Sequence, residues 1–191
     1  MNRLAGIVTL RVATYREIAD DPNATRPALW IVALVSLFVG AVSGLVRSDP
    51  NDPQRLATFD ALSVLEYALI GLAFGLIAWF VGAWVLAFVA RWFGGKTNTK
   101  EMLRVTGYVE IFALVSVLSL VTFWLPALTF VTTAVLFVVS ILRLLGYIIG
   151  IREAAEFSTG NAIVTAIFAL LVAFLIRGAA ELLARFLTGI V

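Results

Sequence analysis

Residues 61–93 read ALSVLEYALIGLAFGLIAWFVGAWVLAFVARWF, and Glu66 is the only charged residue in this stretch before Arg91. A helix needs about 20 mostly apolar residues to cross a bilayer, because the hydrocarbon core is about 30 Å thick and each residue rises about 1.5 Å. The stretch exceeds this length, so it predicts a transmembrane helix that tilts or extends past the membrane surface. It indicates an integral membrane protein.

Four other apolar runs have the length of a membrane span, and they predict an all-α, polytopic membrane helix bundle. The first run follows Arg26-Pro27, a helix-start signal, and stops at Arg47 before the turn-rich stretch 48–53. Only Pro126 separates the third run from the fourth, so we expect these two spans to form a hairpin. The predicted domain of about five transmembrane helices covers residues 29–191, with spans near 29–46, 61–93, 102–125, 127–150 and 161–187.

The composition excludes most soluble and catalytic classes of protein. Apolar residues make up 62% of the 191 residues and charged residues 14%, against roughly 45–50% and 25% in a soluble domain. The surplus apolar surface must face lipid, because a fold of this size cannot bury it. The absence of histidine and cysteine removes the commonest general base, metal ligands and haem ligands. The net charge of +2 is too small to indicate a nucleic-acid partner.

Residues 1–28 form an N-terminal arm of a different character. Charged residues there fall mostly between apolar residues that recur at helical spacing from Leu4 to Ala19. This pattern predicts an amphipathic helix lying at the membrane surface, with packing on the protein's own loops as the alternative. The apolar positions are Leu4, Ile7, Val8, Val12, Tyr15 and Ile18.

Basic residues in the short loops predict the orientation, because cytoplasmic loops carry an excess of lysine and arginine. Nine such residues fall on the side of the N-terminus and three on the other side, which predicts a cytoplasmic N-terminus and an external C-terminus. The nine are Arg3, Arg11, Arg16, Arg26, Arg91, Lys96, Lys100, Arg104 and Arg152, and the three are Arg47, Arg55 and Arg185.

Charges inside the apolar runs are informative because they are costly to bury in a membrane. Glu110 and Arg143 lie some 10–12 Å from the same surface at about 1.5 Å per residue, so we expect them to form an ion pair. Glu66, Arg177 and Glu181 are candidates for a second cluster near the outer leaflet. These groups are either an ion path or matched pairs that hold helices in register, and intramembrane charges commonly pair with one another.

Small residues recur at helical spacing in the first two spans. Ser36, Gly40 and Gly44 share one face of the first span, and Gly71 and Gly75 share one face of the second. Such stripes let helix backbones approach closely. We expect them to serve packing within the chain rather than a dimer interface.

Several short runs resemble the Yip family of membrane proteins, which comprises Ypt/Rab-interacting proteins and their prokaryotic relatives. A Gly-Gly turn after the second span precedes a Leu-Arg and Gly-Tyr segment that opens the third, and two later runs also fit. Family members often carry a proline soon after the Gly-Tyr, whereas Val109-Glu110-Ile111-Phe112 follow here. The runs are ARWFGGK (90–96), EMLRVTGY (101–108), LGYIIGIREA (145–154) and STGNA (158–162).

The resemblance implies five membrane helices and a cytoplasmic N-terminus, and in eukaryotes a role in vesicle transport with small GTPases. We expect the chain to lack a long cytosolic N-terminal region. We therefore expect a prokaryotic-type member in a bacterial or archaeal cytoplasmic membrane, and GTPase binding is not carried over. The family is not known for catalytic residues.

These observations favour a non-enzymatic membrane scaffold, adaptor or accessory subunit. Its expected partners are membrane lipids and other integral membrane proteins, with a larger bioenergetic or photosynthetic complex as one candidate. No cofactor is expected beyond non-covalent contacts with lipid or pigment. The alternative is a small transporter or channel that uses the Glu/Arg pairs, although no internal repeat supports an inverted-repeat transporter. Intramembrane catalysis is disfavoured, because Ser116, Ser119 and Ser140 have no histidine to activate them.

Overall fold

The computed structural model describes residues 3–46 and 60–187, and helices account for nearly all of them. Five stretches within these ranges are long and apolar enough to cross a membrane, which confirms the number of spans predicted from the sequence. The turn-rich stretch 48–53, Arg47 and Arg55 lie outside the described residues. The five candidate spans are Pro22–Leu45, Ala61–Trp92, Thr99–Thr122, Pro126–Ala155 and Thr159–Leu183.

Two spans are built on single helices, α4 (Ala61–Trp92) and α8 (Thr159–Leu187). The first span begins with the 3₁₀ turn η1 (Pro22–Ala24) and continues as α3 (Thr25–Leu45). The fourth span begins with the 3₁₀ turn η3 (Pro126–Leu128) and continues as α7 (Thr129–Ala155). Helix α3 begins ahead of Arg26-Pro27 rather than after it, because a proline in the first turn of a helix breaks no helical hydrogen bond. Helices α3, α7 and α8 each extend past the apolar run that predicted them.

Helices α3 and α4 approach each other closely through the small-residue stripes seen in the sequence. A Cβ atom on Gly71 would lie 2.8 Å from the carbonyl oxygen of Ser36 and 2.9 Å from Cα of Gly40. A Cβ atom on Gly44 would lie 2.9 Å from Cα of Val64, and one on Gly75 would overlap the side chain of Ser36. These glycines therefore occupy a contact inside the chain, where van der Waals packing holds membrane helices together.

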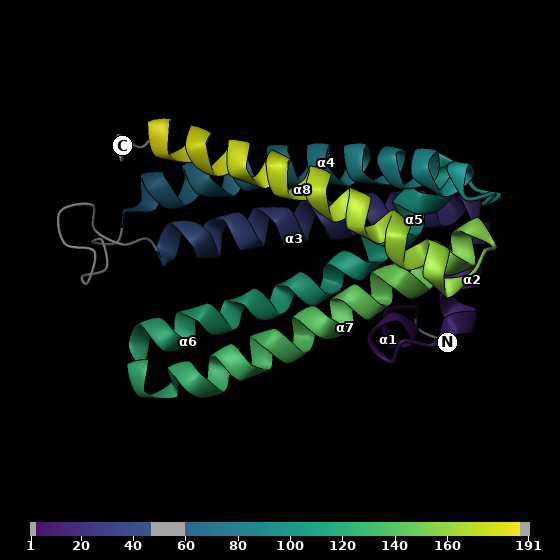
Figure 1. Cartoon of the computed structure of the whole chain (residues 1–191). Helices are drawn as coiled ribbons and strands as arrows, with labels where there is room; N and C mark the ends of the chain where they lie inside the picture. The colour runs from purple at the N-terminus through teal and green to yellow at the C-terminus, as the bar shows by residue number, and fades with distance from the viewer. Residues whose placement is uncertain (1–2, 47–59, 188–191) are drawn as a thin grey trace.

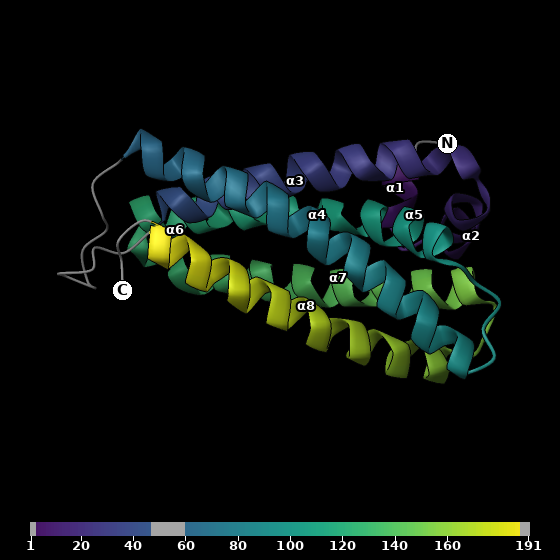
Figure 2. The ribbon, with the colours of Figure 1, turned by 90° about the horizontal axis from the view of Figure 1, so that it is seen from above.

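Helix α5 (Thr99–Val109) fills the space where α3 and α4 diverge at the N-terminal end of the bundle (Figure 2). Asn98 begins the helix, because its side chain accepts hydrogen bonds from the backbone N–H groups of Lys100 and Glu101 while Glu101 reaches back to Asn98. All residues of 102–109 are buried, against α2, α3, α4 and α7. This short helix is the centre of the core.

The third span changes its helix type part-way through. Helix α5 gives way to the 3₁₀ segment η2 (Glu110–Leu118) and then to α6 (Ser119–Trp124). The span predicted over 102–125 is present as Thr99–Thr122, but it is not one α-helix throughout. The change begins at Glu110 although no proline is present there. A 3₁₀ helix rises about 2.0 Å per residue against about 1.5 Å in an α-helix, so this segment lets a short stretch cover more of the membrane.

The N-terminal arm contains two helices rather than the one predicted over Leu4 to Ala19. Helices α1 (Arg3–Val8) and α2 (Val12–Asp20) are separated at Leu10, which has a left-handed backbone with φ 54°. Part of their apolar face lies inside the protein, because Ile7, Tyr15 and Ile18 are fully buried, whereas Val8 and Val12 remain 50% and 41% exposed.

The apolar face of the N-terminal helices packs on helices of the bundle. Figure 1 shows both short helices at the end of the bundle where α7 ends, and α2 contacts α7 and α5. Gly146 and Gly150 on α7 make room for Tyr15, whose hydroxyl donates a hydrogen bond to the carbonyl oxygen of Ile7 at 3.1 Å. Part of the arm therefore packs on the protein itself, as the alternative prediction stated, but on helices α5 and α7 rather than on loops.

Candidate functional site

An ion pair inside the membrane-spanning region joins the third and fourth spans. Arg143 on α7 places Nη2 2.6 Å from Oε2 of Glu110, the first residue of η2. The hydroxyl of Tyr147, one turn along α7, donates a hydrogen bond to Oε1 of Glu110. Both carboxylate oxygens are therefore occupied, and the contact between Glu110 and Arg143 expected from their depths is present.

The same cluster contains a cation–π contact. The guanidinium carbon of Arg143 lies 5.7 Å from the centre of the Tyr147 ring, which favours the positive charge in an apolar setting. Nε of Arg143 is buried and has no hydrogen-bond partner within the described part of the chain. Farther along η2, Ser116 Oγ is likewise buried without a partner among the described residues.

The other three intramembrane charges lie on α4 and α8. Oε1 of Glu181 lies 3.1 Å from Nε of Arg185, four residues along α8. Arg177 is exposed on α8 and lies within electrostatic reach of Glu110. Among the residues that the structure describes, no hydrogen bond or ion pair joins Glu66, Arg177 and Glu181 to one another.

A buried arginine organises the N-terminal end of the bundle. Arg104 on α5 donates from Nη1 to the carbonyl oxygen of Ala19 at 2.6 Å and from Nε to Oγ1 of Thr25 at 3.0 Å. It therefore ties the end of α2 and the start of α3 to the core helix. The sequence counted Arg104 as a loop cation, but only 8% of its surface is exposed. Its position among apolar residues of the Leu-Arg and Gly-Tyr segment was the signal that could have revealed its burial.

A second polar network links α1 to α2 and to the residue that follows α2. Arg3 lies 2.7 Å from Oδ2 of Asp21 and 3.0 Å from Oε1 of Glu17, and both carboxylates raise the pKa of Arg3. The backbone N–H of Asn23 donates to Oδ1 of Asp21 at 2.9 Å. The pKa of Asp21 is therefore below its usual value of 3.8. The hydrogen bond from Asn23 is the largest cause of this shift, and the contact with Arg3 is the next largest.

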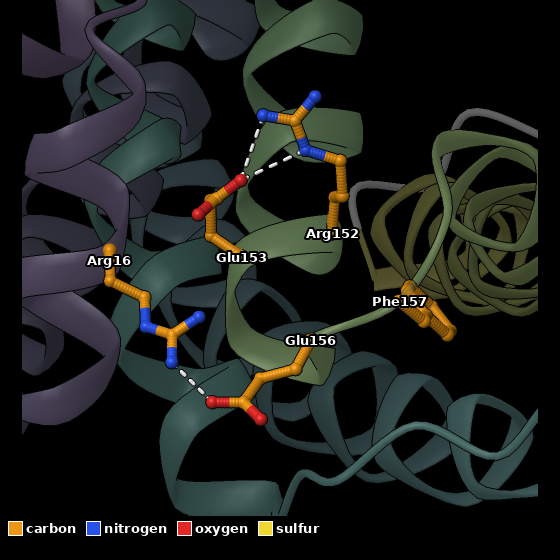
Figure 3. Close-up of a pocket in the computed structure, with 5 residues that line it drawn as sticks. All are labelled: Arg16, Arg152, Glu153, Glu156 and Phe157. Carbon is orange, nitrogen blue, oxygen red and sulfur yellow. Dashed lines mark hydrogen bonds and ion pairs between the residues drawn. The ribbon is translucent and has the colours of Figure 1, made fainter.

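An open pocket of about 370 Å³ lies between α2 and the loop that follows α7. Figure 3 shows the ion pair of Arg16 with Glu156 on one side of it and that of Arg152 with Glu153, at 2.8 Å, on the other. The charge of Glu156 raises the pKa of Arg16. Each charged side chain of the pocket is thus paired within the chain, and Phe157 completes the lining.

Backbone contacts fix the loops around this pocket. The N–H of Lys96 donates to the carbonyl oxygen of Ala155 at 2.9 Å, and Asn161 Nδ2 donates to the carbonyl oxygen of Phe93 at 3.4 Å. The Gly-Gly turn after α4 is therefore docked on the turn between α7 and α8. The described residues contain no group of three or more acidic side chains that could hold a metal ion.

One family of membrane proteins matches most of this chain. The model of the Yip1 domain matches residues 5–179. This chain belongs to the Yip1 domain family. No curated protein and no solved structure gave a significant match.

The Yip1 domain match begins in α1 and ends in α8, so it includes most of α1 and the whole of α2. It also contains the hydrogen bonds of Arg104 and the contact between Glu110 and Arg143. Yip1-domain proteins form a non-enzymatic family of membrane proteins, which agrees with the prediction from composition. The chain is therefore a multi-pass, non-enzymatic membrane protein with a Yip1 domain.

Proposed function

We propose that this Yip1-domain protein is a scaffold or adaptor that binds other integral membrane proteins within the bilayer. Proteins of the family act in membrane trafficking, so we place its partners among membrane proteins that are sorted or carried between membranes. The family match supports neither a prokaryotic-type assignment nor a bioenergetic or photosynthetic complex as the partner. Neither is part of this proposal.

The observation that carries the proposal is the contrast between paired charges and exposed apolar faces. Glu110 has both oxygens occupied by Arg143 and Tyr147, and the charges around the pocket at the N-terminal end pair with one another. The described surface of α7 and α8, by comparison, includes large apolar side chains such as Phe137, 65% exposed, and Phe174, 76% exposed. The groups available for binding are thus those that contact lipid or another membrane helix.

We also propose that the N-terminal end of the bundle faces the cytoplasm. This end carries Arg26, Lys96 and Lys100 as exposed cations, while Arg3 and Arg16 neutralise the acids beside them. An excess of positive charge on one side favours its retention in the cytoplasm. Labelling of single cysteines introduced at Lys96 and at Leu125 in sealed vesicles tests the orientation. Labelling of the cysteine at position 125 from the cytoplasmic side would contradict it.

Purification from native membranes in a mild detergent tests the main proposal. We expect defined membrane proteins to co-purify in fixed ratio and to cross-link to residues of the membrane-spanning helices. Isolation of the chain alone, without a cross-linked neighbour, would contradict a scaffold. The runner-up, a transporter or channel, predicts selective ion flux into vesicles that contain the purified protein, which the scaffold does not.

A further inference from the structure

Three exposed aromatic rings follow one another along the end of α4. Trp84, Phe88 and Trp92 are 51%, 43% and 66% exposed, and their spacing of four residues places them along one side of the helix. The ring centres of Trp84 and Phe88 lie 5.7 Å apart in a stacked arrangement, and those of Phe88 and Trp92 lie 4.9 Å apart edge to face. The three rings form a continuous exposed surface, which we call the aromatic ladder.

The aromatic ladder runs from the end of a membrane span into the hydrocarbon region. The span Ala61–Trp92 ends at the last ring, and Trp84 lies about 12 Å farther in along the helix at about 1.5 Å per residue. One leaflet of the hydrocarbon core is about 15 Å thick, half of the whole. Aromatic anchors of membrane proteins gather at the interface itself, so Trp92 fits that role, whereas Trp84 lies deeper.

Two basic residues lie at the headgroup end of the aromatic ladder. Arg91 follows Phe88 by three residues, which places it on the same side of α4, and its Nε donates to the carbonyl oxygen of Ala87 at 3.0 Å. Lys96 is exposed directly after the Gly-Gly turn, and its backbone N–H is held by Ala155 at 2.9 Å. Both cations therefore lie where the span ends and lipid phosphates begin.

The acids at this end of the bundle have other partners. Those near α2 and at the end of α7 form ion pairs with Arg3, Arg16 and Arg152. Glu101 has both oxygens on Asn98 at the start of α5. Figure 1 and Figure 2 both show α1 across this end of the bundle from the end of α4. Within residues 3–46 and 60–187, no hydrogen bond or ion pair joins a carboxylate to the cations beside the aromatic ladder.

The order of charge and rings along α4 matches the order of groups in a phospholipid. A phospholipid carries its phosphate at the membrane surface and its acyl chains below it, and α4 carries cations at the surface and rings below them. An acidic soluble protein would meet the cations but would not reach Trp84 inside the hydrocarbon. A net negative headgroup fits best, because the cations have no acid beside them to cancel their charge.

We infer that the end of α4 binds an anionic phospholipid, with the phosphate at Arg91 and Lys96 and an acyl chain along the aromatic ladder. The free N–H groups of the Arg91 guanidinium suit phosphate oxygens, and the rings pack on the chain through dispersion. All of the contacts come from this chain alone. The site therefore does not depend on the scaffold proposal, and its failure would leave that proposal standing.

Quenching by lipids with brominated acyl chains tests the site, because bromine quenches a tryptophan on contact. Full-length protein with Trp30→Phe, which removes another exposed tryptophan, is placed in phosphatidylcholine vesicles with a minority of phosphatidylglycerol. Bromine is carried by one lipid or by the other. We expect phosphatidylglycerol to be preferred by at least about fivefold, the contribution of one cation near the membrane surface.

Substitution of the two cations shows whether they cause the preference. Arg91→Gln should remove most of it, and Arg91→Lys should keep it. Lys96→Gln should reduce it in the same direction without changing α4, so the test survives if Arg91→Gln does not fold. Equal quenching by the two lipids before substitution, or a preference that both glutamine variants retain, would show that the site is wrong.

Arg26→Gln is the matched control. Arg26 is an exposed cation at the same end of the bundle, on α3, and α5 fills the space between α3 and α4 there (Figure 2). Its removal lowers the surface charge as much as Arg91→Gln does, but the preference should stay. An equal fall in both variants would assign the preference to the general surface charge and overturn the site.

Two further measurements identify the occupant. Glycerophosphate in solution should not displace the lipid, because it has no acyl chain, and displacement would indicate a site for a free phosphate instead. A photoreactive phenylalanine analogue at position 88, activated in native membranes, should form a lipid adduct. An adduct with a protein in place of lipid would mean that another membrane protein covers the aromatic ladder, and the inference would be wrong.

Discussion

Nη2 of Arg143 lies 2.6 Å from Oε2 of Glu110, the residue at which the third span changes from an α-helix to a 3₁₀-helix. The pair thus joins the third span to α7 at the residue where the helix type of that span changes. Because Tyr147 holds the second oxygen, removal of the carboxylate would leave two polar side chains without their partner. The first prediction follows from this arrangement.

We expect Glu110→Gln to destabilise the protein by about 3 kcal/mol, because breaking a partly buried ion pair inside a membrane span leaves the guanidinium of Arg143 uncompensated. Thermal unfolding in detergent and the folded yield from membranes measure the effect. The double variant Glu110→Leu with Arg143→Leu removes both charges and is expected to recover most of the stability. Unchanged yield and unfolding temperature for Glu110→Gln would argue against a structural role for the pair.

Close packing of α3 and α4 predicts opposite effects of the same substitution at two glycines of α4. Gly71→Ala places a methyl group 2.8 Å from the carbonyl oxygen of Ser36, so the helices must separate, and we expect a loss of about 1–3 kcal/mol. A Cβ atom on Gly82 meets no atom within 4 Å, so Gly82→Ala is expected to stabilise by up to about 1 kcal/mol through helix propensity. Unfolding measurements on both variants in one detergent test this prediction. Equal effects of the two substitutions would contradict the close packing of α3 on α4 at Gly71.

The buried guanidinium of Arg104 predicts a large effect at the N-terminal end. Arg104→Met removes the donors to Ala19 and Thr25, and we expect a loss of about 3 kcal/mol, the sum of two charged hydrogen bonds of about 1.5 kcal/mol each. Lys100→Met, at an exposed position of the same helix, is the matched control and should change stability little. Faster hydrogen exchange in α2 would accompany the loss, and its absence would show that Arg104 does not hold α2.

The network of Asp21 predicts weakening of the N-terminal helices in acid. The folded pKa of Asp21 is lowered, so its stabilising effect is complete above the usual value of 3.8 and disappears as the pH falls through the lower folded pKa. Hydrogen exchange of residues 3–24, corrected for the intrinsic rate, should therefore rise below about pH 4. Asp21→Asn should remove this dependence and speed the exchange already at pH 6. An identical acid profile in the variant would assign the effect to another group.

Local properties of the sequence were sufficient for the spans and for the contact between Glu110 and Arg143. Hydropathy is a property of consecutive residues, and the depth of a charge follows from its distance along a helix, so neither requires knowledge of the fold. The small-residue stripes could also be predicted from the sequence. Helical spacing alone places Gly40 and Gly44 on one face of the first span, and Gly71 and Gly75 on one face of the second. Their assignment to the contact between α3 and α4 needed the structure.

The tertiary structure decided which apolar or polar surface each segment meets. An amphipathic arm has the same pattern whether its apolar face meets lipid or protein, and the space beside Gly146 and Gly150 gives Tyr15 a protein partner. The sequence alone places Arg104 among the loop cations. Only the fold shows that its guanidinium donates hydrogen bonds to Ala19 and Thr25.

The sequence by itself therefore determined that five helices cross a membrane and that two opposite charges lie at one depth. The structure determined the break at Leu10, the change of helix at Glu110 and the exposure of Arg177 without a described partner. The physical reason is that burial in lipid depends on the residues of one segment, whereas packing and counter-charges depend on which segments the fold brings together.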